Sequence, residues 1–274
     1  IAKREAAEKK EIDEISQKIR QDLEVLLPNQ GDEYENDLRV FTRNEVGEYS
    51  VTQGSAENLK LLQDGSILRG DNPLGIKDLK DLDLVVIQAN NAKIAQQQQT
   101  QQDARNRLCA VAGSLVDQGS FDVQGESYSV TENEDVGLSV QVGDRKYVVN
   151  KNEVFEVNVE VLEVLEVEQM QSLENILQEA QEQLQNNISE ESKNLKNVLD
   201  EICPESAKDS VDVGKFNVSR HGDIFTVKSD SELVETYEFT SGAVSLKKGD
   251  QEADKLKISD IRESSEPFSK ALNI

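Results

Sequence analysis

Histidine is the side chain best suited to acid–base chemistry near neutral pH, and this chain has one, His221. His221 follows Arg220 and precedes Gly222, a position typical of a tight hairpin turn. A histidine serves as the base of a nucleophilic site only beside a nucleophile and an orienting acid, and no neighbouring motif supplies either. We therefore expect His221 to be a surface turn residue.

The two cysteines are the next candidates, for nucleophilic or metal chemistry. Cys203 occupies an apolar position of a predicted helix, and Cys109 is next to the predicted core residue Leu108. A reactive thiol needs a cationic neighbour, and the one histidine is distant in sequence. One histidine and two separated cysteines do not make a zinc site. The sequence predicts two buried, reduced thiols, as in an intracellular protein, and a cytoplasmic location.

Other patterns that bind cofactors are missing from the sequence. It has neither a phosphate-binding P-loop nor the glycine fingerprint of dinucleotide-binding folds. The acidic loops at residues 71–72 and 132–135 lack the ligand spacing of an EF-hand. The prediction is a non-enzymatic protein that needs neither a metal nor an organic cofactor.

Carboxylates are the most abundant chemical groups of the chain, and they concentrate in one region. Residues 152–205 contain 14 acidic residues and two lysines. Glu156, Asn158 and Glu160 alternate with valines, which predicts a strand with one wet face. From Leu162 the pattern changes to a period of three, which favours a bulge or a switch from strand to helix. The candidate acidic interaction surface comprises Glu156, Glu160, Glu163 and Glu166.

This acidic surface has three interpretations. It is a solvated face, a docking site that attracts a basic segment of a partner protein, or an imitation of the phosphates of DNA. The net charge of the whole chain is −24, which repels nucleic acids and anionic membranes. No apolar run reaches the 18 or so residues that a membrane-spanning helix needs. We expect no direct nucleic-acid or membrane binding.

The elements that would position these groups follow a repeated helical pattern. Residues 19–28 and 195–204 share four apolar positions and a final proline: Ile19, Leu23, Leu26 and Leu27 align with Leu195, Leu199, Ile202 and Cys203. A looser third copy covers residues 108–116. Self-similarity at a long interval indicates a chain built from copies of one structural unit.

A short strand pattern also recurs three times. Tyr49, Tyr128 and Phe225 each follow a glycine shortly, and each has a valine two residues later. Residues two apart on a strand point to the same face, so we expect these pairs to be core anchors that pack against a helix. The turn signals at residues 64–65, 143–144 and 241–242 predict hairpins.

The predicted fold class is α+β: three tandem units, each with an N-terminal helix followed by a small, four-stranded antiparallel β-meander. The predicted domains are unit 1 at residues 1–90, unit 2 at 91–168, a linking helix at 169–188 and unit 3 at 189–274, with Ser189 as the N-cap of the third helix. In this scheme the copies lie at uneven intervals, because the linking helix adds length between units 2 and 3.

The predicted function is that of a non-catalytic, acidic repeat protein that binds a protein partner as an adaptor or assembly module. The partner would present a basic segment, and self-association through the N-terminal helix is a further expectation. The alternative is an acidic mimic of nucleic acid that inhibits a DNA- or RNA-binding protein.

Overall fold

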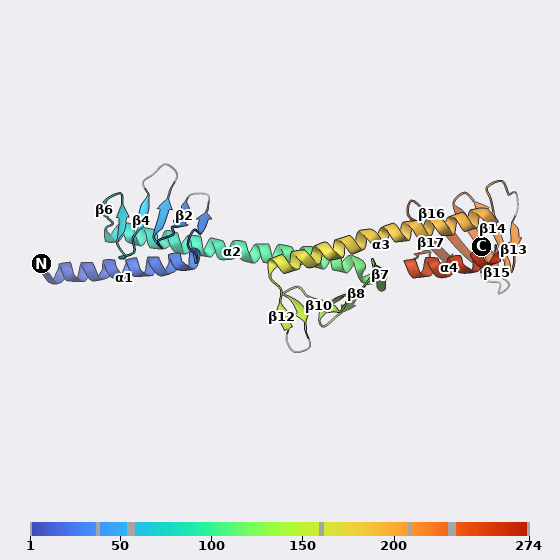
Figure 1. Ribbon diagram of the computed structural model, residues 1–274, viewed down its shortest axis with the longest axis horizontal. Coiled ribbons are helices and arrows are strands. Elements are labelled where there is room, and N and C mark those ends of the chain that lie inside the picture. The colour runs from blue at the N-terminus through green and yellow to red at the C-terminus, as the bar shows by residue number, and fades with distance from the viewer. Residues whose placement is uncertain are drawn as a thin grey trace. The chain divides into compact units, whose positions relative to one another are not determined.

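The computed structural model describes residues 2–36, 39–53, 58–158, 162–207, 210–229 and 234–272. The fold is α+β, with four α-helices and three six-stranded antiparallel sheets in the described residues (Figure 1). The helices are α1 (Ala2–Leu26), α2 (Ile76–Leu115), α3 (Val167–Ile202) and α4 (Ile258–Ala271), and a 3₁₀ turn, η1 (Val116–Gln118), follows α2.

Each sheet is a simple meander in which strands pair in chain order, so every connection is local. Sheet A contains β1 (Glu33–Glu35), β2 (Val40–Arg43), β3 (Tyr49–Thr52), β4 (Leu59–Leu61), β5 (Ile67–Arg69) and β6 (Asn72–Pro73). Sheet B contains β7 (Ser120–Val123), β8 (Glu126–Asn133), β9 (Gly137–Val142), β10 (Arg145–Val149), β11 (Val154–Val157) and β12 (Leu162–Val164). Sheet C contains β13 (Val211–Val213), β14 (Phe216–His221), β15 (Ile224–Ser229), β16 (Val234–Thr240), β17 (Ala243–Lys248) and β18 (Asp254–Lys255). The prediction of meanders is confirmed, with six strands in each instead of four.

The structure confirms the predicted hairpin turns and the burial of the recurring aromatic and valine pairs. The predicted turns at 64–65, 143–144 and 241–242 each connect two paired strands. The three aromatic residues of the recurring strand pattern, and the valines that follow them, are all buried. However, Tyr49 and Phe225 lie in the third strand of their sheets, whereas Tyr128 lies in the second. The second copy of that pattern is therefore shifted by one strand.

The helices α2 and α3 are longer than the sequence pattern predicted. Residues 167–202 form one helix, so the prediction of a separate linking helix and of Ser189 as an N-cap is wrong. The physical reason is that no proline or glycine interrupts this stretch, and its buried stripe continues past residue 189 through Ile188, Leu195 and Leu199. The predicted limit at 90/91 likewise falls inside α2.

Each sheet lies between the end of one helix and the start of the next, and we call this arrangement a module. Module 1 consists of α1, sheet A and the start of α2. Module 2 consists of the end of α2, sheet B and the start of α3. Module 3 consists of the end of α3, sheet C and α4. The helix α2 therefore belongs to modules 1 and 2, and α3 to modules 2 and 3.

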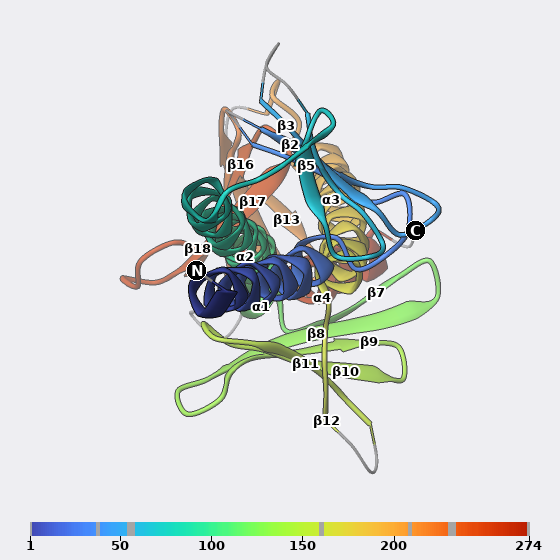
Figure 2. The same ribbon diagram turned by 90° about the vertical axis from the view of Figure 1, so that its left-hand side faces the viewer.

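In module 1 the two helices run side by side in the same direction (Figure 2). Glu11 of α1 pairs with Lys80 of α2 at 2.6 Å, and Lys18 pairs with Asp83 at the same distance. Further along, the amide of Asn90 donates to the carbonyl of Asp22, so residue numbers increase together on both helices. The apolar faces of this pair and of sheet A form one core, which includes Ile19, Leu23, Phe41, Tyr49, Leu79 and Val86.

Modules 2 and 3 share a second continuous core. By its contacts the chain separates into two compact units, Ile1–Gln102 and Asp103–Ile274. In the second unit, α3 contributes a buried stripe along most of its 36 residues, from Met170 to Ile202. That stripe packs first against sheet B and then against sheet C, which explains why one cluster includes buried residues from both sheets.

The entry into each second helix reveals a regular repeat that the sequence reading did not find. Leu74, Leu165 and Leu256 are spaced by 91 residues, and each donates its backbone N–H to the fifth strand of its sheet. The interval continues into the helices at two further sets of buried residues. The first set is Leu79, Met170 and Ile261, and the second is Val86, Leu177 and Phe268. The three modules are therefore equivalent from the fifth strand onward.

One chemical pair is also repeated between modules 1 and 2. Asp83 and Glu174 are 91 residues apart, and each pairs with a cation of the preceding helix, Lys18 and Arg107, at 2.6 and 3.2 Å. Glu174 is buried in spite of its charge. Its other oxygen accepts a hydrogen bond from Gln178, so the carboxylate keeps polar partners inside the helix pair. This repeated ion pair fixes the lengthwise register of adjacent helices.

Candidate functional site

The sequence-predicted chemical residues lie apart from one another. His221 is exposed at the end of β14, beside the two-residue turn to β15, as predicted. Cys203 is buried at the end of α3, whereas Cys109 is only half-buried on α2, and both thiols are free. Burial raises the pKa of the Cys109 thiol, which makes it a poorer nucleophile. Among the described residues, no three or more metal-ligating side chains gather in one place.

The predicted acidic surface is brought together only in part. Glu156 on β11 and Glu163 on β12 are directly opposite each other in the antiparallel ladder. Glu166 is exposed just before α3, where its backbone N–H donates to the side chain of Gln169. Glu160 lies outside the described residues. The predicted switch from strand to helix after Leu162 is confirmed, since β12 ends at Val164 and α3 begins at Val167.

Glu156 is on the opposite face of its strand from the one predicted. Val154 is buried, and Glu156, two residues later, points to that same side and is half-buried. Its ladder partner Tyr147 is also buried, and the Glu156 charge helps to raise the pKa of that phenol, although burial is the larger cause. Successive residues of a strand point to alternate sides, so the burial of Val154 places Glu156 on the inner side of the sheet.

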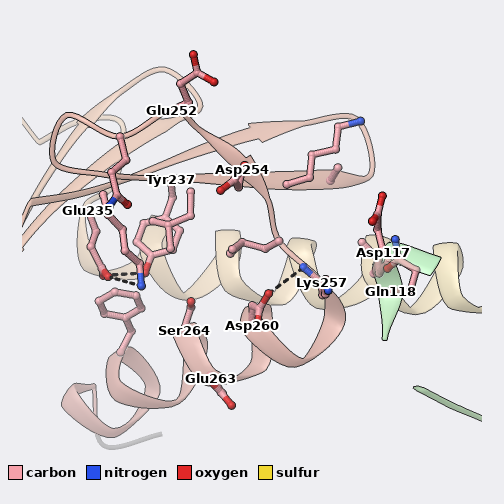
Figure 3. A pocket seen from close by; sticks show the side chains of 18 of the residues that line it. Asp117, Gln118, Glu235, Tyr237, Glu252, Asp254, Lys257, Asp260, Glu263 and Ser264 are labelled. Atoms are coloured by element: carbon pink, nitrogen blue, oxygen red, sulfur yellow. Dashed lines mark hydrogen bonds and ion pairs between the residues drawn. The ribbon is translucent and has the colours of Figure 1, made fainter. Parts of the chain in front are cut away.

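A cleft in module 3 has a volume of about 1000 Å³ (Figure 3). Its walls come from the middle of α3, from β16 to β18, from α4, and from η1 of module 2. The floor is apolar, because Ile188 and Leu246 are buried beneath it, and Leu256 is half-exposed at the point where the chain enters α4.

An aromatic cluster supports the floor of this cleft. The Phe268 ring of α4 is 5.0 Å from the Phe216 ring and 6.0 Å from the Tyr237 ring, both in edge-to-face contact. The Tyr237 hydroxyl donates a hydrogen bond to Glu235 at 3.0 Å (Figure 3). The Lys248 ammonium is 3.7 Å from the same carboxylate. The ring contacts hold Phe268, Phe216 and Tyr237 in place, and the hydrogen bond and the ion pair hold the Glu235 carboxylate.

Carboxylates dominate the rim of the cleft. Six acidic residues line it, against three lysines: Asp117, Glu235, Glu252, Asp254, Asp260 and Glu263 are opposed by Lys248, Lys255 and Lys257. The exposed side chains of Asp117, Glu252, Asp254 and Glu263 make no hydrogen bond or ion pair with any described residue. A cation that enters the cleft therefore meets carboxylates that are not already neutralised.

Module 1 has a cleft at the equivalent place, with a volume of about 780 Å³. Ile12 of α1 corresponds to Ile188 of α3 in the repeated helix, and Leu74 corresponds to Leu256, and all four line their clefts. The module 1 cleft contains two acidic and two basic residues: Asp13, Asp64, Lys9 and Arg20. The same geometry is therefore present twice, and only the module 3 copy has an acidic excess. Two sequence signals could have located both clefts: the interval of 91 residues for Leu74 and Leu256, and the match between residues 19–28 and 195–204 for Ile12 and Ile188.

Burial raises the pKa of Tyr237 well above its ordinary value, and the neighbouring charge of Glu235 raises it further. Because the folded state holds this proton more tightly than the unfolded chain, the contribution of Tyr237 to stability is complete below pH of about 10 and is lost as the pH rises above it. We expect the free energy of unfolding to fall as the pH rises above about 10.

Urea unfolding at several pH values measures this effect. In Tyr237→Phe, which has no ionisable group, the decline over the same range should be smaller than in the wild type. An identical pH dependence of the two proteins would show that Tyr237 does not titrate as the structure indicates.

Comparison with known proteins gives no relative from which a function could be transferred. No described helix combines the length and the apolar character required to cross a membrane. No family model, curated protein or solved structure matches this chain.

Proposed function

We propose that this chain is a non-catalytic protein-binding module, an adaptor or assembly subunit, in which the module 3 cleft receives a basic segment of a partner protein. The observation that carries the proposal is the combination of an apolar floor with four unpaired carboxylates at its rim. Apolar side chains of the partner would gain burial on the floor, and its lysine or arginine residues would pair with the rim. The three-unit organisation, with clefts of different charge in modules 1 and 3, suits a scaffold that has more than one binding surface.

The cytoplasmic location belongs to the same proposal. Two free thiols support it, since structural disulfides are the rule for secreted proteins that contain cysteine pairs. The nucleic-acid mimic stays a prediction, and the structure gives it less support than the cleft. A mimic needs carboxylates at regular spacing on one face, whereas the described members of the acidic surface include only one directly opposed pair.

A peptide-display selection on the intact chain tests the proposed cleft. We expect the selected peptides to combine lysine or arginine with a bulky apolar residue. Their affinity should fall at least about tenfold when the four unpaired carboxylates are neutralised together as Asp117→Asn, Glu252→Gln, Asp254→Asn and Glu263→Gln. These positions are exposed, so the fold should be retained.

The matched control neutralises four other exposed carboxylates that make no hydrogen bond or ion pair with a described residue, at Glu5, Glu8, Glu45 and Glu134. This control has the same net charge as the cleft variant. If both variants bind the selected peptides equally, the attraction is a general effect of net charge and the cleft proposal is wrong.

A further inference from the structure

The open edge of sheet B presents a second surface, which is independent of the cleft. The strand β12 is the outermost strand of this sheet, and no described strand pairs with its other side (Figure 1). Such an edge is a template for the addition of another strand.

The hydrogen-bonding groups at this edge can be assigned from the ladder. The Leu165 N–H donates to the Val154 carbonyl, and Glu163 is opposite Glu156 two residues earlier in the same ladder. In antiparallel pairs the backbone groups of alternate residues point to the same neighbour. The N–H and C=O groups of Glu163 therefore face β11, and those of Leu162 and Val164 face the open edge.

The two faces of the sheet at this edge carry different kinds of side chain. On the outer face, Leu162 is 62% and Val164 is 45% exposed, and their ladder partners Val157 and Phe155 are half-buried. These four residues form a continuous apolar stripe on the solvent side of the sheet. A strand added to β12 would extend the stripe if its own outward residues were apolar.

The opposite face of the same two strands is acidic. Glu156 and Glu163 are directly opposed like charges, an arrangement that is destabilising in a sheet, and neither makes an ion pair with a described residue. A residue added opposite Glu163 would relieve the repulsion if it were lysine or arginine. A second copy of this chain would instead place another glutamate there, so the edge disfavours self-pairing.

We propose that the β12 edge binds an extended segment of a partner protein in which apolar and basic residues alternate, by strand addition to sheet B. The outward apolar residues of the segment pack beside Leu162 and Val164. The inward basic residues pair with Glu163, whose charge lies directly opposite that of Glu156. The backbone of the segment bonds to Leu162 and Val164.

The probe is a short labelled peptide in which valine and lysine alternate, with binding to the full chain followed by fluorescence anisotropy at low salt. We expect Glu163→Lys to weaken binding at least about tenfold. Val164→Pro should weaken it similarly, because it removes an N–H donor that points to the open edge, a position where proline is tolerated. Glu134→Lys, the same charge change on an exposed residue between β8 and β9, should have a much smaller effect.

Two results would overturn the proposal. Equal weakening by Glu163→Lys and Glu134→Lys would reduce the interaction to net charge. Unchanged binding of a peptide with N-methylated backbone amides would show that no strand is added. The cleft variant with four neutralised carboxylates separates the two sites: it should bind this probe as the wild type does, and binding lost only there would assign the probe to the cleft. Circular dichroism of each variant establishes that it is folded.

Discussion

Replacing Phe268 with alanine is expected to lower the free energy of unfolding of the second compact unit by about 3–5 kcal/mol. Phe268 is 2% exposed, and its ring touches the rings of Phe216 and Tyr237. The substitution removes a large apolar side chain from the junction of α4 and sheet C. Because the Phe216 and Tyr237 rings are held in place by other contacts, they cannot easily fill the space that Phe268 leaves. The energetic cost of this cavity adds to that of the lost apolar burial.

Denaturant unfolding of the full chain, followed by circular dichroism, measures the loss. The control is Ser259→Ala, an exposed position of the same helix, which should change stability by less than about 0.5 kcal/mol. A loss below about 1 kcal/mol for the Phe268 variant would contradict the packing described for module 3. Val86 and Leu177 occupy the equivalent position in modules 1 and 2, so the same experiment there compares the three copies.

The substitution Gly137→Ala is expected to cost about 2–5 kcal/mol, an unusual effect for the addition of one methyl group. Gly137 has a φ of +98°, which L-residues rarely adopt. A Cβ atom there would also lie 2.6 Å from the Val149 carbonyl oxygen and 3.1 Å from Cβ of Asn150. Backbone strain and a clash with the neighbouring hairpin therefore add.

Gly125→Ala separates the two contributions. Gly125 has a φ of +85° in another hairpin of the same sheet, but its Cβ would meet nothing within 4 Å. We expect this variant to lose about 1 kcal/mol from strain alone. Equal losses for the two variants, measured by the same unfolding titrations, would mean that the contact with residues 149 and 150 is not tight.

Local sequence signals predicted the local structure well. The turns at 64–65, 143–144 and 241–242 depend on glycine at positions where the chain must reverse, and a reversal requires no distant partner. The burial of Tyr49, Phe225 and their valines follows from side-chain alternation in a strand. Both kinds of signal operate over a few residues, so they remain valid whatever the rest of the chain does.

Helix boundaries and the interval of the repeat depended on longer-range information. The match between residues 19–28 and 195–204 was visible, but it marks only the end of a helix. The interval of 91 residues was present in Leu74, Leu165 and Leu256, yet single leucines are too common to be noticed. Only the structure shows that each of them joins the fifth strand to the following helix.

The sequence by itself determined the α+β class, the meanders, the hairpin turns and the identity of most core residues, because periodicity and turn chemistry are local. Tertiary structure alone decided the inner orientation of Glu156, the pairing of Glu163 with it, and the cleft between α3, sheet C and α4. Each of these depends on which strand edge or helix face lies opposite a residue. Such a choice is made by packing between segments far apart in the chain, so it leaves no pattern within either segment alone.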